Sequence, residues 1–136
     1  MRVVVDVNVL ISALLSGRGV PARILRAWFE GAFELIVSPL LLSELQRALG
    51  YPKLRKRIPE DDAGRFIALL ERSAKVVDDP AAPPPLRSSD PGDDYLLALA
   101  AAEQAALVSG DRHVIALRRA GRPIYTPSEF VDRLAH

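Results

Sequence analysis

The feature that most constrains the fold is a run of β-branched residues near the N-terminus, Val3-Val4-Val5, which is followed by Asp6. Branched side chains at every position, without alternation, predict a strand that is buried on both faces. Such strands belong to parallel sheets covered by helices, which bind ligands outside the carboxyl ends of their strands. Asp6 is therefore a candidate functional residue, and a helix N-cap is its alternative role.

Short apolar segments alternate with longer helical patterns along the chain, and this order predicts an α/β layered fold. Five segments have the composition of strands: residues 2–6, 33–37, 75–78, 106–109 and 123–125. Ser38-Pro39 and Thr126-Pro127 are start signals for two helices, because a hydroxyl side chain caps a helix and proline suits its first position. The proline-rich residues 79–89 are expected to run extended over the surface.

The composition limits the size of the protein and the kinds of site it can carry. A chain of 136 residues fits a single domain with a sizeable core. The chain has no cysteine, and His113 and His136 are too few for an imidazole zinc cage, so any bound metal ion should be a hard one. The net charge of +1 neither favours nor excludes a nucleic-acid partner. We recognise no leader sequence and no apolar run near the ~20 residues of a membrane span, so we expect a cytoplasmic protein without membrane contact.

Glu44 is the second candidate, because its helical position does not suit a charge. At about 100° per residue, the pattern over residues 40–49 places Glu44 within a broad apolar arc. A buried, ionised carboxylate without partners is costly, so we expect Glu44 to meet a cation, a metal ion or the edge of a polar pocket. The alternative is an ion pair with an arginine, or a side chain that reaches solvent at the rim of the arc.

A third group of acids lies in the sequence Asp-Pro-Gly-Asp-Asp at residues 90–94. Asp90, before a proline, is placed to cap a helix, and Asp93 is placed to support that cap or the helix dipole. Asp94 enters the first full turn of a pattern over residues 95–102 that is apolar nearly all round, and it lacks such a structural explanation. We therefore take Asp94 as the candidate and keep Asp93 as the alternative.

Asp111 is the fourth candidate, because it follows the predicted strand over residues 106–109. Two strand-end aspartates of a parallel sheet would face one crevice, although capping the next helix is again the alternative. Four converging carboxylates would repel one another, and a divalent cation would relieve that repulsion. Oxygen ligands alone suit Mg²⁺ or Mn²⁺, which points toward phosphodiester chemistry by a metal-activated water.

Four segments, in order and at suitable spacing, resemble the motifs of the PIN-domain nucleases. Residues 3–10 are similar to the family's opening strand and first acid, and residues 38–45 to its glutamate-bearing helix. Residues 94–100 are similar to the helix with the third acid, and residues 107–111 to the strand that ends in the fourth. The resemblance covers essentially the whole chain. It implies a single PIN-like domain at residues 1–136, built as a three-layer sandwich with a mostly parallel sheet of four to five strands flanked by helices.

The resemblance also implies metal-dependent cleavage of RNA with Mg²⁺ or Mn²⁺ as cofactor. The residues that it marks as catalytic and metal-binding are Asp6, Glu44, Asp94 and Asp111, and further candidate ligands are Asp93, Asn8 and Ser109. The sequence at residues 90–94 resembles the toxin components of prokaryotic toxin–antitoxin pairs, which implies a small antitoxin protein as a partner.

Two positions depart from the family pattern. Position 7 is valine where a hydroxyl residue is common, whereas Ser109 keeps the hydroxyl near the fourth acid. His113 stands where many members carry another aspartate. If that aspartate helps to hold a second metal ion, this protein binds one ion tightly and another weakly or not at all.

Two other functions compete with a nuclease. An aspartyl phosphatase would attack with Asp6, but it would need a second acid two residues later, where this chain has Asn8. The other is a non-catalytic PIN-like module that binds RNA or protein, and the retained acids argue against it because buried carboxylates cost stability without a metal ion.

Two surface features bear on partners. The basic stretch at residues 53–57 suggests contacts with RNA phosphates, with a solvated face as the alternative. Trp28 and Phe29 suggest either a homodimer interface or core packing.

Overall fold

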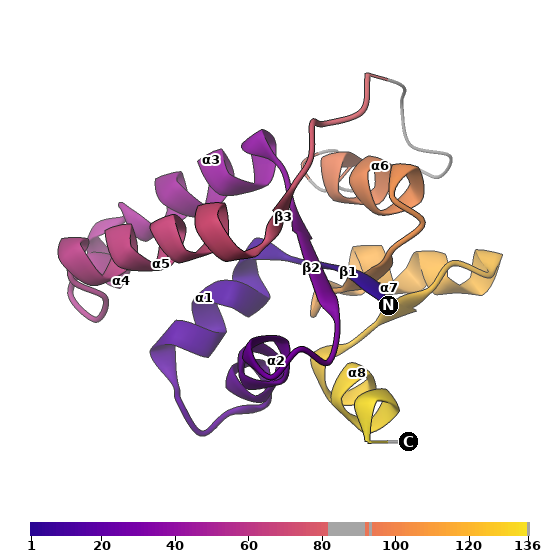
Figure 1. Ribbon diagram of the computed structural model, residues 1–136, viewed down its shortest axis with the longest axis horizontal. Coiled ribbons are helices and arrows are strands. Elements are labelled where there is room, and N and C mark those ends of the chain that lie inside the picture. The colour runs from indigo at the N-terminus through magenta and orange to yellow at the C-terminus, as the bar shows by residue number, and fades with distance from the viewer. Residues whose placement is uncertain (82–91, 93, 136) are drawn as a thin grey trace.

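A five-stranded sheet forms the centre of the computed structural model, which describes residues 1–81, 92 and 94–135. The strands lie in the order β3-β2-β1-β4-β5, and every neighbouring pair is parallel (Figure 1). Their bounds are β1 (Arg2–Val5), β2 (Glu34–Val37), β3 (Lys75–Val76), β4 (Ala106–Val108) and β5 (Ile124–Tyr125). The five strands predicted from the sequence are confirmed, and the parallel sheet confirms the α/β class.

Helices cover both faces of this sheet. Their bounds are α1 (Val7–Leu15), α2 (Val20–Phe29), α3 (Pro39–Leu49), α4 (Pro52–Arg55), α5 (Glu60–Ser73), α6 (Asp94–Ala102), α7 (Arg112–Ile115), the 3₁₀ helix η2 (Ala116–Ala120) and α8 (Pro127–Leu134). Figure 1 shows α6 above the strands and α2 and α8 below them, which agrees with the predicted three-layer sandwich. No helix in the described part of the chain is long and apolar enough to cross a membrane.

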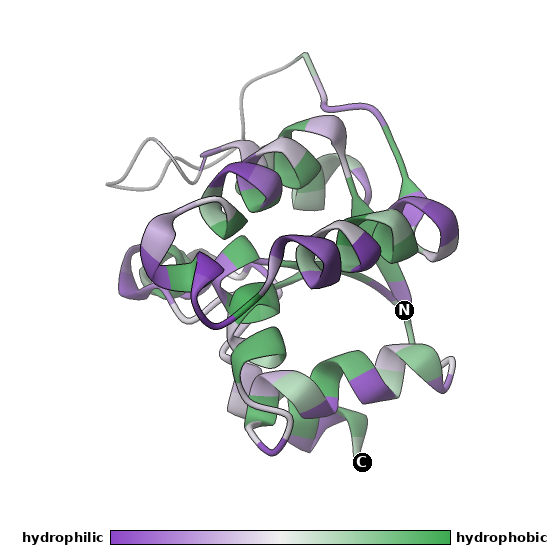
Figure 2. Ribbon diagram, turned by 90° about the vertical axis from the view of Figure 1, so that its left-hand side faces the viewer, coloured by the Kyte–Doolittle hydropathy of each residue, from purple (hydrophilic) through white to green (hydrophobic). Residues whose placement is uncertain are grey.

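The core is centred on β1, as the run of valines predicted. Val3, Val4 and Val5 have exposed fractions of 0%, 0% and 1%, and Val4 lies between Ile36 of β2 and Leu107 of β4. The strands are mostly hydrophobic in Figure 2, whereas the helices carry both hydrophobic and hydrophilic residues. This distribution is expected of helices that present one face to the sheet and the other to solvent.

The predicted helix starts are confirmed where the structure describes them. The Ser38 hydroxyl accepts a hydrogen bond from the backbone N–H of Leu41 at 3.3 Å, and Thr126 forms a complete capping box with Glu129. The helix that follows Asp111 starts at Arg112, with Asp111 as its N-cap. Residues 82–89 of the predicted extended segment, and the predicted cap Asp90, lie outside the described residues.

The order of the strands reverses in the middle of the sheet. The chain passes from β1 to β2 on one side and from β4 to β5 on the other, so β1 and β4 lie at the switch point. Sheets of this kind bind ligands in the crevice outside the carboxyl ends of such strands. Asp6 directly follows β1 and Ser109 directly follows β4, and both therefore lie at this crevice.

Leu107 provides a test of the core. It is 1% exposed and lies between Val4 of β1 and Ile124 of β5. Leu107→Ala is expected to lower the free energy of unfolding by about 2–5 kcal/mol, because it removes buried methyl groups and leaves a cavity. The control Leu40→Ala, at a position that is 52% exposed, should change it by less than about 0.5 kcal/mol. Urea unfolding measures both, and equal losses would contradict this description of the core.

Candidate functional site

Asp6 is fixed at the junction between β1 and α1. Its backbone N–H donates to the carbonyl of Val108 at 2.9 Å, which extends the pairing of β1 with β4 by one residue. One carboxylate oxygen accepts from the backbone N–H of Asn8 at 3.2 Å, and the other from the hydroxyl of Ser109 at 2.8 Å. Asp6 is only 5% exposed. It is thus the N-cap of α1 and a buried acid at the switch point at once.

The surroundings of Asp6 disfavour its charged form. Burial raises the pKa of the Asp6 carboxyl above its usual value, and this effect outweighs the hydrogen bonds from Ser109 and Asn8, which lower it. The negative charges of Asp111 and Glu44 raise the pKa of Asp6 further. Three of the four candidate acids are therefore close enough to interact electrostatically.

Ser109 links the ends of the two central strands. Its side chain is fully buried; the hydroxyl donates to Asp6 and accepts from the backbone N–H of Asp111 at 3.0 Å. The Asp111 carboxylate accepts from the backbone N–H of His113 at 2.7 Å and so caps α7. The capping roles given above as alternatives for Asp6 and Asp111 are both present in the structure.

Glu44 is half-buried on α3 and forms an ion pair. Both of its carboxylate oxygens accept from Nη2 of Arg47 at 2.6 Å, and its side chain is 40% exposed. Nη1 of the same arginine donates to the Tyr51 hydroxyl at 3.1 Å. The arginine partner given above as an alternative for Glu44 is therefore present.

A cavity of about 220 Å³ joins Asp6 to Glu44. Its lining comes from the start of α1, from α3 and from the region of α6, and it includes Asn8, Arg47 and Tyr95. Asp111 lines a neighbouring cavity of about 320 Å³, and Asn8 lines both. The structure thus brings Asp6 and Glu44 to one cavity and places Asp111 at the next.

Asp94 is the first residue of α6 and is half-buried. Its neighbours Gly92 and Tyr95 line the cavity that contains Asp6, although Asp94 itself is not part of that lining. Asp93 lies outside the described residues, so the choice between Asp93 and Asp94 stays a prediction.

The chemistry of these side chains suits a hard divalent cation, because carboxylate and amide oxygens are the ligands that Mg²⁺ and Mn²⁺ prefer. Their present arrangement is not a complete cage, since no three acidic or imidazole side chains among the described residues are placed to hold a metal ion. Asp6 is hydrogen-bonded to Ser109, Glu44 to Arg47 and Asp111 to the start of α7. A cation would have to replace some of these partners.

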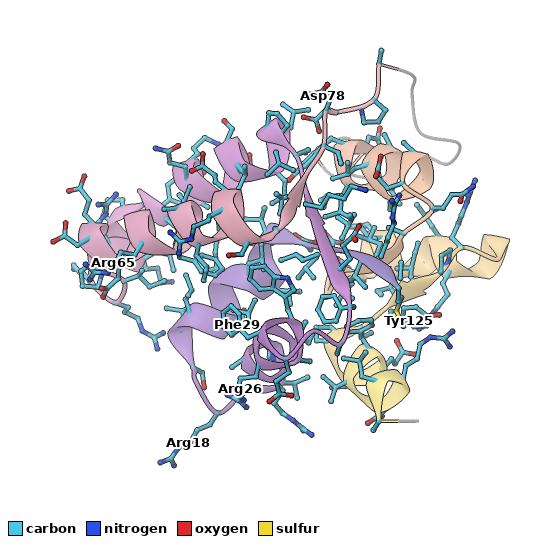
Figure 3. The ribbon with its side chains drawn as sticks, in the orientation of Figure 1. Arg18, Arg26, Phe29, Arg65, Asp78 and Tyr125 are labelled. Atoms are coloured by element: carbon cyan, nitrogen blue, oxygen red, sulfur yellow. The ribbon has the colours of Figure 1, made fainter. Side chains whose placement is uncertain are left out.

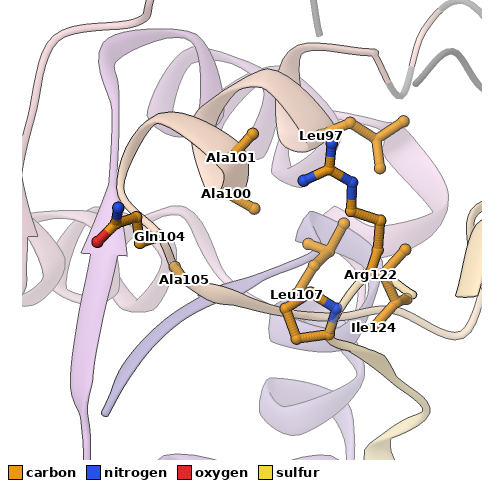
Figure 4. Close-up of a pocket in the computed structure, with 9 residues that line it drawn as sticks. Leu97, Ala100, Ala101, Gln104, Ala105, Leu107, Arg122 and Ile124 are labelled. Carbon is orange, nitrogen blue, oxygen red and sulfur yellow. The ribbon is translucent and has the colours of Figure 1, made fainter. Parts of the chain in front are cut away.

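A cavity of about 410 Å³ elsewhere in the molecule contains none of the candidate acids (Figure 4). It lies between α6 and the strands β4 and β5, and its lining includes Leu97, Leu107 and Ile124. Arg122 is the charged side chain in this lining. The described side chains of this lining include no carboxylate, hydroxyl or thiol, so we place the candidate site at Asp6.

Arg47 and Tyr51 belong to the lining of the site, but neither was predicted from the sequence to do so. For Arg47 the available signal was its spacing from Glu44, because side chains three residues apart on a helix are neighbours; Tyr51 lies beyond the end of α3 and had no such signal. The basic stretch at residues 53–57 begins within α4, where Arg55 pairs with Glu60 at 3.5 Å. Trp28 belongs to the core at 8% exposed, whereas Phe29 is 57% exposed.

Residues 2–113 match the PIN domain family. The chain belongs to this family. The matched range includes Asp6, Glu44, Asp94 and Asp111, and family membership confirms the resemblance seen in the sequence.

Similar proteins support the same fold. The chain is 29% identical to the uncharacterized protein MJ1680 of Methanocaldococcus jannaschii, over 97% of this chain and 90% of the other. VapBC2 from Rickettsia felis, solved bound to a DNA fragment from its promoter, contains a chain with a TM-score of 0.62 at 15% identity, over 92% of this chain and 97% of that one. PAE2754 from Pyrobaculum aerophilum has a TM-score of 0.61 at 19% identity, over 99% of this chain and 90% of that one. At these identities the solved structures establish the fold alone.

The environment of Asp6 predicts a pH-dependent effect of Asp6→Asn. The folded protein holds the Asp6 proton more tightly than the unfolded chain does. Ionisation of Asp6 therefore lowers the free energy of unfolding as the pH rises above 3.8, the ordinary pKa of this carboxyl. Asparagine keeps the cap without the charge. We expect Asp6→Asn to raise the thermal midpoint by a few degrees at pH 7 without divalent cations, with a gain that shrinks as the pH falls toward 3.8.

The matched control is Asp78→Asn, which removes one carboxylate at an exposed position (Figure 3). The gain from Asp6→Asn at pH 7 should exceed that of the control. Thermal melts over a series of pH values give both quantities. A loss of stability with Asp6→Asn that is the same at every pH would refute this account of the Asp6 environment.

Proposed function

We propose that the protein is a divalent-metal-dependent ribonuclease whose site is formed by Asp6, Glu44, Asp94 and Asp111. The observation that carries the proposal is the buried carboxylate of Asp6, which lies at the switch point of a PIN domain near two further acids. Its hydrogen-bond donors in the described structure, Ser109 and Asn8, bring no positive charge. A buried acid in such surroundings is typical of a site that binds a cation.

Each acid would contribute from a different element. Asp6 is held in place by two hydrogen bonds, Asp111 is tied to the same serine through its backbone, and Glu44 reaches the cavity from α3. Asp94 would approach from the start of α6, and Asn8, Ser109 and Asp93 are further candidate ligands. A bound Mg²⁺ or Mn²⁺ would activate water and neutralise charge on the scissile phosphodiester.

The proposal extends to the partners of the site. The substrate would be RNA, and the exposed basic residues near α4 are candidates for phosphate contacts. The resemblance of residues 90–94 to toxin components, together with the fold shared with the VapBC2 chain, supports a toxin that acts in the cytoplasm with a small antitoxin protein as its partner. Exposed Phe29 is the feature that favours a homodimer, and residues 1–136 would form one PIN-like domain.

One observation favours a second candidate, a non-catalytic PIN-like module that binds RNA or protein. Glu44 is already paired with Arg47, and the described acids do not form a complete metal cage. In such a protein Asp6 and Asp111 would serve as helix caps, and Glu44 as a member of an ion pair. The two functions make opposite predictions for the removal of one charge.

Asp94→Asn tests the nuclease proposal. It keeps the shape of the side chain but removes a ligand charge, so Mg²⁺-dependent RNA cleavage should fall by more than about 100-fold, since even outer-shell partners of a metal contribute 10- to 100-fold. The assay uses a pool of structured and unstructured RNAs with Mg²⁺, Mn²⁺ or a chelator. Added Mn²⁺ should also raise the thermal midpoint of the wild type more than that of the variant.

Asp78→Asn is again the control and should cleave at the wild-type rate. An Asp94→Asn protein that cleaves at that rate would remove Asp94 from the site. If Asp6→Asn also left Mg²⁺-dependent cleavage unchanged, the nuclease proposal would be wrong and the binding module would be favoured.

A further inference from the structure

Arg47 places a positive charge in the cavity that holds Asp6 and Glu44. Its guanidinium lines that cavity, and a single nitrogen, Nη2, lies 2.6 Å from both Glu44 oxygens. Two short charge-assisted hydrogen bonds from one nitrogen leave Glu44 facing the arginine. The guanidinium therefore lies against the carboxylate oxygens through which Glu44 would bind a cation.

A second contact holds Arg47 in this direction. Its other terminal nitrogen, Nη1, donates to the hydroxyl of Tyr51 at 3.1 Å, and Tyr51 also lines the cavity. Glu44 and Arg47 are neighbours at i,i+3 on α3, and Tyr51 reaches Arg47 from the N-cap of α4, directly after the end of α3. Each terminal nitrogen of Arg47 thus has a partner, and these two contacts hold the exposed guanidinium against Glu44.

We propose that Arg47 is a positioning residue that competes with the divalent cation for Glu44. The inference rests on the proposed function, because it takes Glu44 as a metal ligand. The guanidinium and a metal ion both bind Glu44 through its carboxylate oxygens, and their positive charges repel each other at that distance, so the ion pair opposes metal coordination. Without a metal ion, Arg47 offsets part of the repulsion between Glu44 and Asp6, and it thereby raises the cation concentration at which the site fills.

The solvent exposure of Arg47 and Glu44 determines how much the ion pair should change the affinity for the metal ion. The side chains of Arg47 and Glu44 are 61% and 40% exposed, so solvent screens their attraction. Breaking a pair of this kind typically shifts an equilibrium by about two- to fivefold. Removal of Arg47 should therefore tighten metal binding by about two- to fivefold.

The test is calorimetric titration of the full chain with Mn²⁺, without RNA. Arg47→Met removes the positive charge but keeps an unbranched apolar stem, and it should lower the Kd for Mn²⁺ by that factor. The matched control is Arg65→Met, because Arg65 pairs with Asp62 at the same i,i+3 spacing on α5. Figure 3 shows Arg65 at the end of the molecule away from α6. The control should leave the Kd unchanged.

A double-mutant cycle with Glu44→Gln separates competition for Glu44 from a general effect of charge. In the Glu44→Gln background, Arg47→Met should no longer tighten Mn²⁺ binding. If Glu44→Gln abolishes binding, the double variant should not bind either. Tightening or recovered binding in the double variant would overturn the inference, because Arg47 would then act on other acids.

Two results distinguish this inference from the proposed function. An identical Kd for the wild type and Arg47→Met, or equal tightening by Arg65→Met, would overturn the competition and leave the metal site intact. Failure of both the wild type and Arg47→Met to bind Mn²⁺ would overturn the metal site itself, and the competition with it.

Discussion

The parallel pairing of β1 with β4 determines where the candidate site residues lie. The two strands lie side by side in the centre of the sheet, and the hydrogen bond from Asp6 to Val108 carries their pairing one residue past the end of β1. This register brings Asp6 next to Ser109, although the two are 103 residues apart in the sequence. α1 and α7 start from the same edge, and α6 packs on both strands. The site is thus a consequence of the strand order.

The sequence predicted the features that depend on local patterns. The buried run of valines, the five strands and the caps at Ser38 and Thr126 follow from side-chain branching, periodicity and capping chemistry, which neighbouring residues determine. The Glu44 ion pair was harder to predict, because helix periodicity gives the face of a side chain but not the partner that it selects. All five strands are one or two residues shorter than predicted, and β1 ends at Val5 because Asp6 already serves as the N-cap of α1.

Capping and ligand binding proved not to be exclusive interpretations of the strand-end acids. Asp6 uses one oxygen for the N–H of Asn8, and Asp111 uses one for the N–H of His113. A carboxylate has about four lone-pair sites, so a capping bond leaves acceptor capacity for another partner. One strand-end aspartate can therefore cap a helix and bind a cation at the same time.

The direct passage from β1 into α1 has a mechanical consequence. Asp6 is the single residue between Val5 of the strand and Val7 of the helix, so the strand and the helix together fix the position of its backbone. Glu44, in contrast, extends from α3 on a longer side chain with more rotatable bonds. Under the proposed function, one half of the site is rigid and the other is adjustable. Rotation about the side-chain bonds of Glu44 would then let the site bind ions of slightly different radius. Asp6, which β1 holds in place, would keep the attacked phosphate at a constant position.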